Sequence, residues 1–242
     1  MDIKQVGSRG VLFSFDEIGG ATNVYVINGT KHIFIIDTFI GPEAMEPVNS
    51  YIENNIGEKP IIVVNTHYHW DHVWGNCTYV SYPIVAHEKC MEFLAANGEE
   101  DLKKHEEYAK GKVKITLPNL TFTEKLMYEE DRVMLFHSPG HTEDSISIYD
   151  EQDKVLIVGD NLERPIPYLM AKSLDTYLKT LQGYLKMDFH VVTGGHIGLE
   201  GEQLIRDNAE YIRSFADGCA PESEDEEYKY IHELNKKRCT DK

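Results

Sequence analysis

Hydrophobic and polar positions divide the chain into short apolar runs and longer amphipathic stretches. Turn residues such as Gly19-Gly20 and Asn28-Gly29 separate the first apolar runs, which is typical of strands joined in hairpins. Strands are predicted at residues 11–15, 22–27, 32–36, 61–65, 84–86, 120–128, 132–136, 145–149, 155–158 and 190–193. Apolar residues at helical spacing predict helices at 43–54, 88–110 with a break near 97–98, 173–187 and 203–216.

Acidic and basic residues occupy opposite ends of a last predicted helix, at about residues 222–238. Ser223 and Glu226 have the spacing of a capping box at its start, and Lys236-Lys237-Arg238 lies at its end. The chain shows no internal repeat, low-complexity segment or linker. We therefore expect residues 1–242 to form a single domain of mixed strands and helices that ends in this helix.

Composition and charge argue against several classes of function. The chain has 242 residues, of which 41% are hydrophobic, as is ordinary for a globular protein. Its formal net charge of -17 disfavours a nucleic-acid-binding surface, which needs a basic stripe. No apolar run reaches the roughly 18–20 residues that cross a membrane, and the N-terminus lacks the pattern of a signal peptide. Widely spaced cysteines, at positions 77, 90, 219 and 239, indicate reduced thiols and a cytoplasmic location.

The segment Thr66-His67-Tyr68-His69-Trp70-Asp71-His72 gathers three histidines and one aspartate directly after an apolar run. Imidazole and carboxylate are the usual ligands of zinc and related divalent ions. His67 and His69 alternate and so face the same way in extended backbone, whereas the adjacent Asp71 and His72 can turn towards a second ion. Four ligands exceed the three that a single catalytic zinc takes from a protein. The segment therefore predicts a site for two ions.

Three further ligand-type residues follow predicted strands through small turn residues. They are His141 in Ser138-Pro139-Gly140-His141-Thr142, Asp160 after Gly159, and His196 after Gly194-Gly195. Strand ends present functional groups, and glycines allow the backbone to bend tightly there. Each residue alone could be a turn residue bonded to its own backbone, but together they indicate one metal site with the first cluster. The other histidines, at 32, 87, 105, 137, 190 and 232, do not cluster and are predicted not to be ligands.

The order THYHWDH, SPGHT, VGD and GGH resembles that of the metallo-β-lactamase superfamily over nearly the whole chain. The resemblance implies an α+β fold, a four-layer αββα sandwich of two mixed β-sheets flanked by helices, with a metal cleft at one edge. It also implies two divalent metal ions with the ligands His67, His69 and His141 for one, Asp71, His72 and His196 for the other, and Asp160 between them. The many imidazoles favour Zn²⁺, and Fe and Mn stay open.

This ligand set predicts a metal-dependent hydrolase. Two ions about 3.5–4 Å apart can hold a bridging hydroxide that attacks a carbonyl or phosphoryl centre. The resemblance implies that Asp71 is catalytic, orienting the hydroxide and carrying a proton to the leaving group. The predicted substrate is a small-molecule ester, thioester, lactone or amide; the alternatives are a metal-binding scaffold or sensor without turnover, and a phosphodiesterase. No nucleic-acid or membrane partner is expected, and the oligomeric state stays open.

Subfamily features leave the substrate itself open. The best-known β-lactamases of the superfamily carry Cys at the position of Asp160, and its lactonases carry Tyr at the position of Glu163. We expect the cleft entrance to be formed by residues 17–20, Trp70, Trp74 and the 161–170 loop. Packing beneath the metal loop is the alternative for both tryptophans, and it is favoured for Trp74. Tyr168 either overhangs the cleft or is an exposed residue of a proline-stiffened loop.

Overall fold

The computed structural model describes residues 1–240, which contain two mixed β-sheets. The first sheet has seven strands in chain order: β1 (Asp2–Val6), β2 (Gly10–Phe15), β3 (Thr22–Asn28), β4 (Ile33–Ile36), β5 (Ile61–Val64), β6 (Ile84–His87) and β7 (Leu120–Phe122). The second has five in the order β12 (Val191–Thr193), β11 (Val155–Ile157), β10 (Ile146–Asp150), β9 (Val133–His137) and β8 (Lys125–Tyr128). β1 to β4 pair antiparallel, whereas β4 to β7 pair parallel.

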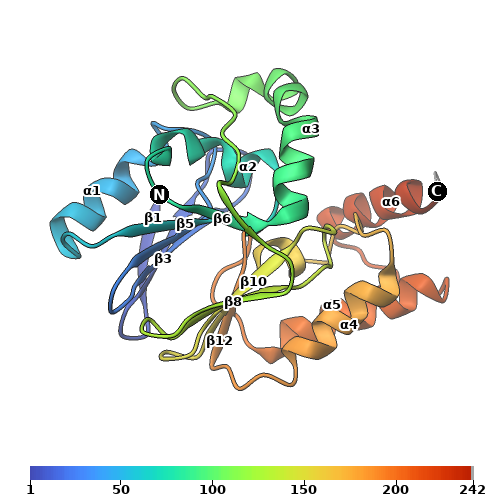
Figure 1. Cartoon of the computed structure of the whole chain (residues 1–242). Helices are drawn as coiled ribbons and strands as arrows, with labels where there is room; N and C mark the ends of the chain where they lie inside the picture. The colour runs from blue at the N-terminus through green and yellow to red at the C-terminus, as the bar shows by residue number, and fades with distance from the viewer. Residues whose placement is uncertain (241–242) are drawn as a thin grey trace.

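Helices cover the outer faces of both sheets (Figure 1). The first sheet is covered by α1 (Glu46–Asn55) and α3 (Glu88–Lys104). The second sheet is covered by α4 (Leu174–Tyr184) and α5 (Glu202–Ala216), and α6 (Glu226–Thr240) packs against the same apolar core. Shorter helices lie in the connections: α2 (Trp70–Val73), η1 (Trp74–Tyr79), η2 (Glu106–Tyr108) and η3 (Gly159–Asn161).

The apolar core forms three layers because successive side chains of a strand face opposite sides of its sheet. In β4, Ile33 and Ile35 pack towards α1, whereas Phe34 and Ile36 enter the layer between the two sheets. The second sheet fills that middle layer from its own side, and its outer face packs on α4 and α5. This arrangement confirms the predicted αββα sandwich.

Two predicted elements differ from the observed ones. The predicted strand 120–128 is in fact β7 and β8, which belong to different sheets, so the chain crosses between the sheets at residues 123–124. The predicted break at 97–98 is wrong, because α3 continues through it. Gly98 is buried there, and a Cβ at this position would lie 3.0 Å from both Ile115 Cγ2 and Leu94 Cδ1. The glycine therefore permits close packing rather than ending the helix. The exposed edge strand β1 was not predicted.

The C-terminal helix α6 begins at Glu226, later than the predicted start, because Asp225 and not Ser223 caps it. Asp225 Oδ1 accepts a hydrogen bond from Tyr228 N at 2.8 Å, while Ser223 Oγ accepts one from Asp225 N at 3.2 Å. The proposed single domain extends to residue 242, and residues 241–242 lie outside the described part.

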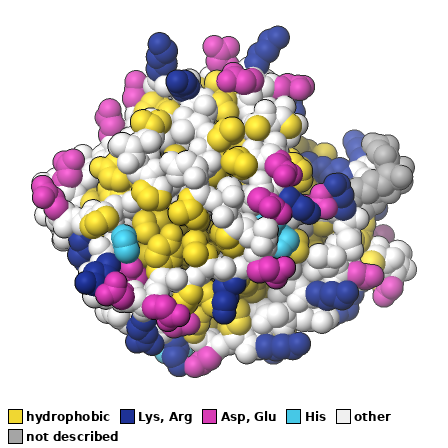
Figure 2. Space-filling model, in the orientation of Figure 1, with side chains coloured by type: hydrophobic (Ala, Val, Ile, Leu, Met, Phe, Trp, Pro, Cys, Tyr) yellow, Lys and Arg dark blue, Asp and Glu magenta, His cyan; other side chains and the backbone are white. Residues whose placement is uncertain are grey.

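Three cysteines, Cys77, Cys90 and Cys219, are free thiols, and the side chain of Cys239 lies outside the described part. Within residues 1–240, no helix combines the length and the apolar character needed to span a membrane. On the face shown in Figure 2, acidic and basic side chains are interspersed around apolar areas and form no basic stripe in the described part.

Candidate metal centre

The first four candidate ligands come from the turn that follows β5. This strand is buried and lies between β4 and β6, so it fixes where the turn begins. His67 and His69 lie in the turn itself, and Asp71 and His72 lie in the short helix α2. The helical turn brings His72 back beside His67, with ring centroids 4.3 Å apart.

The other three candidates follow strands of the second sheet. His141 lies between β9 and β10, Asp160 lies in η3 directly after β11, and His196 follows β12. Because β11 and β12 are parallel neighbours, Asp160 and His196 leave the sheet at the same edge. The structure thus brings all seven residues predicted from the sequence to one place, in two groups.

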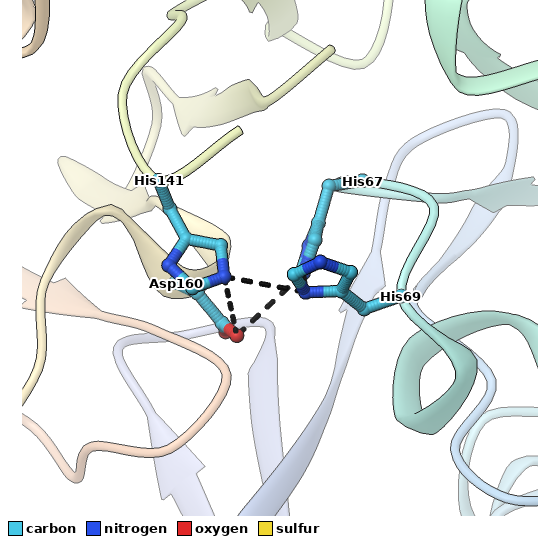
Figure 3. Close-up of side chains that lie close together, drawn as sticks. All are labelled: His67, His69, His141 and Asp160. Carbon is cyan, nitrogen blue, oxygen red and sulfur yellow. Dashed lines mark hydrogen bonds and ion pairs between the residues drawn. The ribbon is translucent and has the colours of Figure 1, made fainter. Parts of the chain in front are cut away.

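One group consists of four residues whose ligand atoms all lie within 4.8 Å of one another: His67, His69, His141 and Asp160. Figure 3 shows these side chains converging on a common space from the turn after β5, the β9–β10 connection and η3. His69 Nδ1 lies 2.9 Å from His67 Nε2 and 3.2 Å from His141 Nε2. Asp160 Oδ2 lies 3.6 Å from His67 Nε2 and 3.8 Å from His141 Nε2. Three imidazoles and a carboxylate suit a divalent ion such as zinc.

Asp71, His72 and His196 form the second group. Asp71 Oδ2 lies 3.2 Å from His196 Nε2 and 3.6 Å from His72 Nε2. Asp160 contacts this group as well, with Oδ1 3.4 Å from His72 Nε2 and Oδ2 3.3 Å from His196 Nε2. Its carboxylate therefore faces both groups, as a bridging ligand must.

The histidines of the two groups differ in protonation. Burial lowers the pKa of His67, and it lowers the pKa of His69 to about 4 and of His141 to about 3. These rings are neutral at pH 7, which is the form that binds a metal. Burial also lowers the pKa of His72 and His196, but the carboxylates of Asp160 and Asp71 outweigh it and raise the pKa well above the usual value. The second group thus holds protons that a divalent ion would replace.

Buried polar atoms without hydrogen-bond partners test whether the centre fits metal ions. Among the described residues, His72 Nε2 and Asp160 Oδ1 are buried and have no hydrogen bond, although the two atoms are 3.4 Å apart. A Cβ at Gly195 would overlap Asp160 Oδ1 and the His72 ring, so the glycine keeps this space open. Unsatisfied buried polar groups are costly unless a ligand satisfies them. The residues therefore fit the divalent ions that the ligand set implies.

Asp37, which was not predicted, supports the second group from behind. Its Oδ1 accepts a hydrogen bond from Thr66 N at 2.7 Å, and its Oδ2 accepts one from Thr66 Oγ1 at 2.7 Å and lies 2.8 Å from His72 Nδ1. Such outer contacts fix the orientation of a ligating imidazole. Asp37 directly follows β4 with a φ of 62°, an uncommon conformation for a residue other than glycine. Its only sequence signal was a carboxylate after an apolar strand.

An open cleft of about 540 Å³ lies above the candidate ligands. Its walls include residues 18–20 of the hairpin tip expected at 17–20, the adjacent Ala21, and part of the expected 161–170 loop, from which Tyr168 faces the cleft. Neither tryptophan lines the cleft, so the expected place at the entrance is wrong for Trp70, whereas Trp74 packs as the favoured alternative predicts. Trp70 stacks on His105 with ring centroids 4.9 Å apart, and Trp74 is buried, so both pack beside or beneath the metal turn.

Glu163 is a second functional candidate that was not predicted. It lines the cleft although its side chain is only 5% exposed. Its Oε2 accepts a hydrogen bond from Tyr168 N at 2.6 Å and lies 3.9 Å from His141 Nδ1. Burial raises its pKa well above the usual value. Its position three residues after Asp160 was its only sequence signal.

Histidines outside the two groups have other contacts. His87 stacks on His137 with ring centroids 3.9 Å apart, and its Nε2 lies 3.0 Å from Thr123 O. His32 Nδ1 lies 2.6 Å from Asp131 Oδ2. These contacts stabilise turns and strand ends, and they lie away from the cleft.

Comparisons with known proteins agree with this geometry. The family model for the metallo-beta-lactamase superfamily matches residues 18–196. The chain is 24% identical over 229 residues to the acyl-coenzyme A thioesterase MBLAC2 of Bos taurus, covering 82% of this chain and 81% of that protein. It is 28% identical over 179 residues to an N-acyl homoserine lactonase of Bacillus sp, covering 66% of each. A metallo-beta-lactamase structure from Pontibacter korlensis matches with a TM-score of 0.68 at 20% identity, covering 88% of this chain and 98% of that chain. The chain therefore belongs to the metallo-beta-lactamase superfamily and is a metal-dependent hydrolase.

Proposed function

We propose that the protein is a dinuclear hydrolase of small-molecule esters, thioesters, lactones or amides. The observation that carries this proposal is the convergence of seven ligand-type side chains into two groups that share Asp160 on the floor of an open cleft. We propose Zn²⁺ as the metal because imidazoles are the most numerous ligands. When bound, two such ions supply Lewis-acid activation of water and of the substrate carbonyl.

Asp71 is the proposed catalytic residue. It lines the cleft, and His196 Nε2 and His72 Nε2 hold its Oδ2 from two sides. Burial would raise the pKa of Asp71, but His72 and His196 lower it to about 2, so the carboxylate is ionised at neutral pH. In this form it can orient a water molecule in the cleft, accept its proton and deliver that proton to the leaving group.

The charge of the cleft walls favours a substrate without phosphate groups. Apart from the candidate ligands, the ionisable Glu and Arg residues among the described ones lining the cleft are Glu163, Arg164 and Glu227, and burial disfavours the charged form of Glu163. The Arg164 guanidinium donates two hydrogen bonds to the Glu200 carboxylate, at 2.7 and 2.8 Å, which neutralises its charge. A polyanionic leaving group such as coenzyme A would thus find no unpaired basic side chain among the described cleft residues and would meet the Glu227 carboxylate, at a cost in binding free energy. An uncharged acyl ester, lactone or thioester fits better.

The two alternatives are less well supported. A metal-binding scaffold or sensor needs no access to the ions, whereas this cleft is open to solvent and lies directly over both ligand groups. A phosphodiesterase would bring an anionic substrate against Glu227, with no unpaired basic side chain among the described cleft residues. The proposed location is the cytoplasm, and the free thiols of the described cysteines agree with a reducing compartment.

A substrate panel on protein of measured metal content tests the proposal. Hexanoyl thioesters of N-acetylcysteamine and of coenzyme A share the acyl group and the scissile bond but differ in charge. We expect turnover of both, with kcat/KM about tenfold or more higher for the uncharged thioester. Preference for the coenzyme A thioester would contradict only the charge argument and would leave the hydrolase proposal intact. No turnover of any ester, thioester, lactone or amide by protein holding two ions would contradict the hydrolase proposal and favour the scaffold.

A further inference from the structure

A buried asparagine in α6 holds the loop that walls the cleft. Asn235 is 0% exposed, and its side chain bonds two backbone groups of that loop. Its Nδ2 donates to Pro167 O at 2.9 Å, and its Oδ1 accepts from Leu169 N at 2.8 Å. The residue between these two anchor points is Tyr168, which faces the cleft.

The beginning of the loop is held in a similar way from α5. Asn208, which is 1% exposed, accepts a hydrogen bond from Glu163 N and donates one to Glu163 O, each at 3.0 Å. Glu163 Oε2 in turn accepts the hydrogen bond from Tyr168 N. Buried asparagines from two helices therefore hold a segment that has no regular secondary structure of its own.

These contacts make α6 part of the cleft, although it lies beyond residues 18–196, which the family model matches. Glu227 in its first turn lines the cleft, and the Arg238 guanidinium carbon near its end lies 5.9 Å from the centre of the Tyr168 ring. Tyr168 and Met170 form an apolar wall of the cleft on the loop side, and Ile18 lines the cleft from the hairpin tip. An apolar part of a substrate bound in the cleft would contact these side chains.

We propose that Asn235 is a positioning residue for substrate selection. By fixing the backbone on both sides of Tyr168, it sets the wall against which the acyl chain of the substrate binds. This inference rests on the proposed function, because it assigns the apolar wall to the acyl side of the scissile bond. Asn235 acts through Tyr168 and takes no part in the reaction at the metal centre.

The test compares short and long acyl chains, using acetyl and hexanoyl thioesters of N-acetylcysteamine. In Asn235→Ala the two loop hydrogen bonds are lost, so we expect KM for the hexanoyl substrate to rise about tenfold. The turnover number and kcat/KM for the acetyl substrate should stay within about twofold, because the metal centre is untouched. Tyr168→Ala should show the same loss of selectivity. KM for the hexanoyl substrate should be no higher in the double variant than in Tyr168→Ala, because both changes act on one wall.

Asn119 provides a control for the loss of a pair of backbone hydrogen bonds, although it is exposed and Asn235 is buried. Its Nδ2 donates to Tyr82 O and its Oδ1 accepts from Ile84 N, each at 2.9 Å, so it makes the same pair of backbone bonds beside β6 and away from the cleft. Asn119→Ala should leave the selectivity between acetyl and hexanoyl substrates unchanged. An equal loss on both substrates in Asn235→Ala, or additive losses in the double variant, would overturn the proposal.

Hydrogen exchange separates this inference from the proposed function. The Leu169 amide should exchange faster in Asn235→Ala than in the wild type or in Asn119→Ala, and this readout needs no turnover. Unchanged exchange at Leu169 would overturn the role of Asn235 whatever the activity. Absence of turnover by a wild type with normal metal content would instead overturn the proposed function, and with it the role in selection.

Discussion

Replacing Asp37 by asparagine should separate support of the metal centre from stability of the fold. The Asp37 carboxylate is 3% exposed and accepts hydrogen bonds from the Thr66 amide and hydroxyl, and it holds His72 Nδ1 at 2.8 Å. Asparagine keeps the shape and one acceptor oxygen, but its NH₂ group would face the His72 ring nitrogen where a carboxylate oxygen now lies. The charge-assisted bond to His72 Nδ1 and the bond that Oδ2 accepts from Thr66 Oγ1 are lost, whereas Oδ1 keeps its bond from Thr66 N.

The expected magnitude follows chiefly from the charge-assisted bond to His72, which is the stronger of the two lost contacts. A hydrogen bond to a charged group contributes about 1.5–3 kcal/mol, so the free energy of unfolding of metal-free Asp37→Asn should fall by about this amount. Loss of an outer partner of a ligating histidine costs about 10–100-fold in metal affinity. We expect this loss for the ion held by Asp71, His72 and His196, and a smaller loss for the other ion.

Asp131→Asn is the matched control. The Asp131 carboxylate is 1% exposed, accepts hydrogen bonds from Lys31 N and His32 N, and lies 2.6 Å from His32 Nδ1, so it repeats the contacts of Asp37 away from the metal centre. Denaturant unfolding and calorimetric titration of metal-free protein with Zn²⁺ measure the two effects. Both variants should lose stability, but only Asp37→Asn should lose metal affinity. Wild-type affinity for both ions in Asp37→Asn, or an equal loss in Asp131→Asn, would refute the role of Asp37.

Three further predictions concern catalysis, pH and packing. Asp71→Ala should lower kcat by about 10²–10⁴-fold at saturating metal; an unchanged kcat would exclude Asp71 from proton transfer. Burial raises the pKa of Asp144 from 3.8 to about 6, so the folded protein favours the protonated carboxyl. The resulting contribution to the free energy of unfolding is complete below about pH 4 and is lost as the pH rises through about 6, a change of about 3 kcal/mol. The stability of Asp144→Asn relative to the wild type should therefore rise over that range in denaturant unfolding, and a constant difference would contradict the shift. A Cβ at Gly183 in α4 would meet open space, so Gly183→Ala should raise the free energy of unfolding by about 0.5–1 kcal/mol. A Cβ at Gly98 would meet Ile115, so Gly98→Ala should be less stable than Gly183→Ala in thermal unfolding. The reverse order of stability would refute the packing role of Gly98.

The candidate ligands could be predicted because each lies beside a local signal. His67 to His72 follow an apolar strand within one short segment, and His141, Asp160 and His196 each follow a strand through a small residue. An apolar strand followed by a turn with a ligand-type residue recurs along the chain, and this pattern predicts a metal cleft at the strand ends. The αββα order of layers came instead from the resemblance of these motifs to a known family.

Residues whose role depends on distant partners could not be predicted. Asp37 bonds Thr66 across 29 positions, and Asn235 bonds Leu169 across 66. Such pairings are set by how the sheets and helices pack, which leaves no periodic trace in the sequence. The split of 120–128 between two sheets has the same origin, because both halves read as strand and only the packing decides which sheet each joins.

Metal stoichiometry measured together with turnover tests the central claim most directly. Purified protein should bind two divalent ions per chain, lose hydrolysis of the N-acetylcysteamine thioester when both are removed by a chelator, and regain it in proportion as Zn²⁺ is restored. Binding of only one ion by the intact set of seven ligands, or full turnover by metal-free protein, would contradict a dinuclear hydrolase.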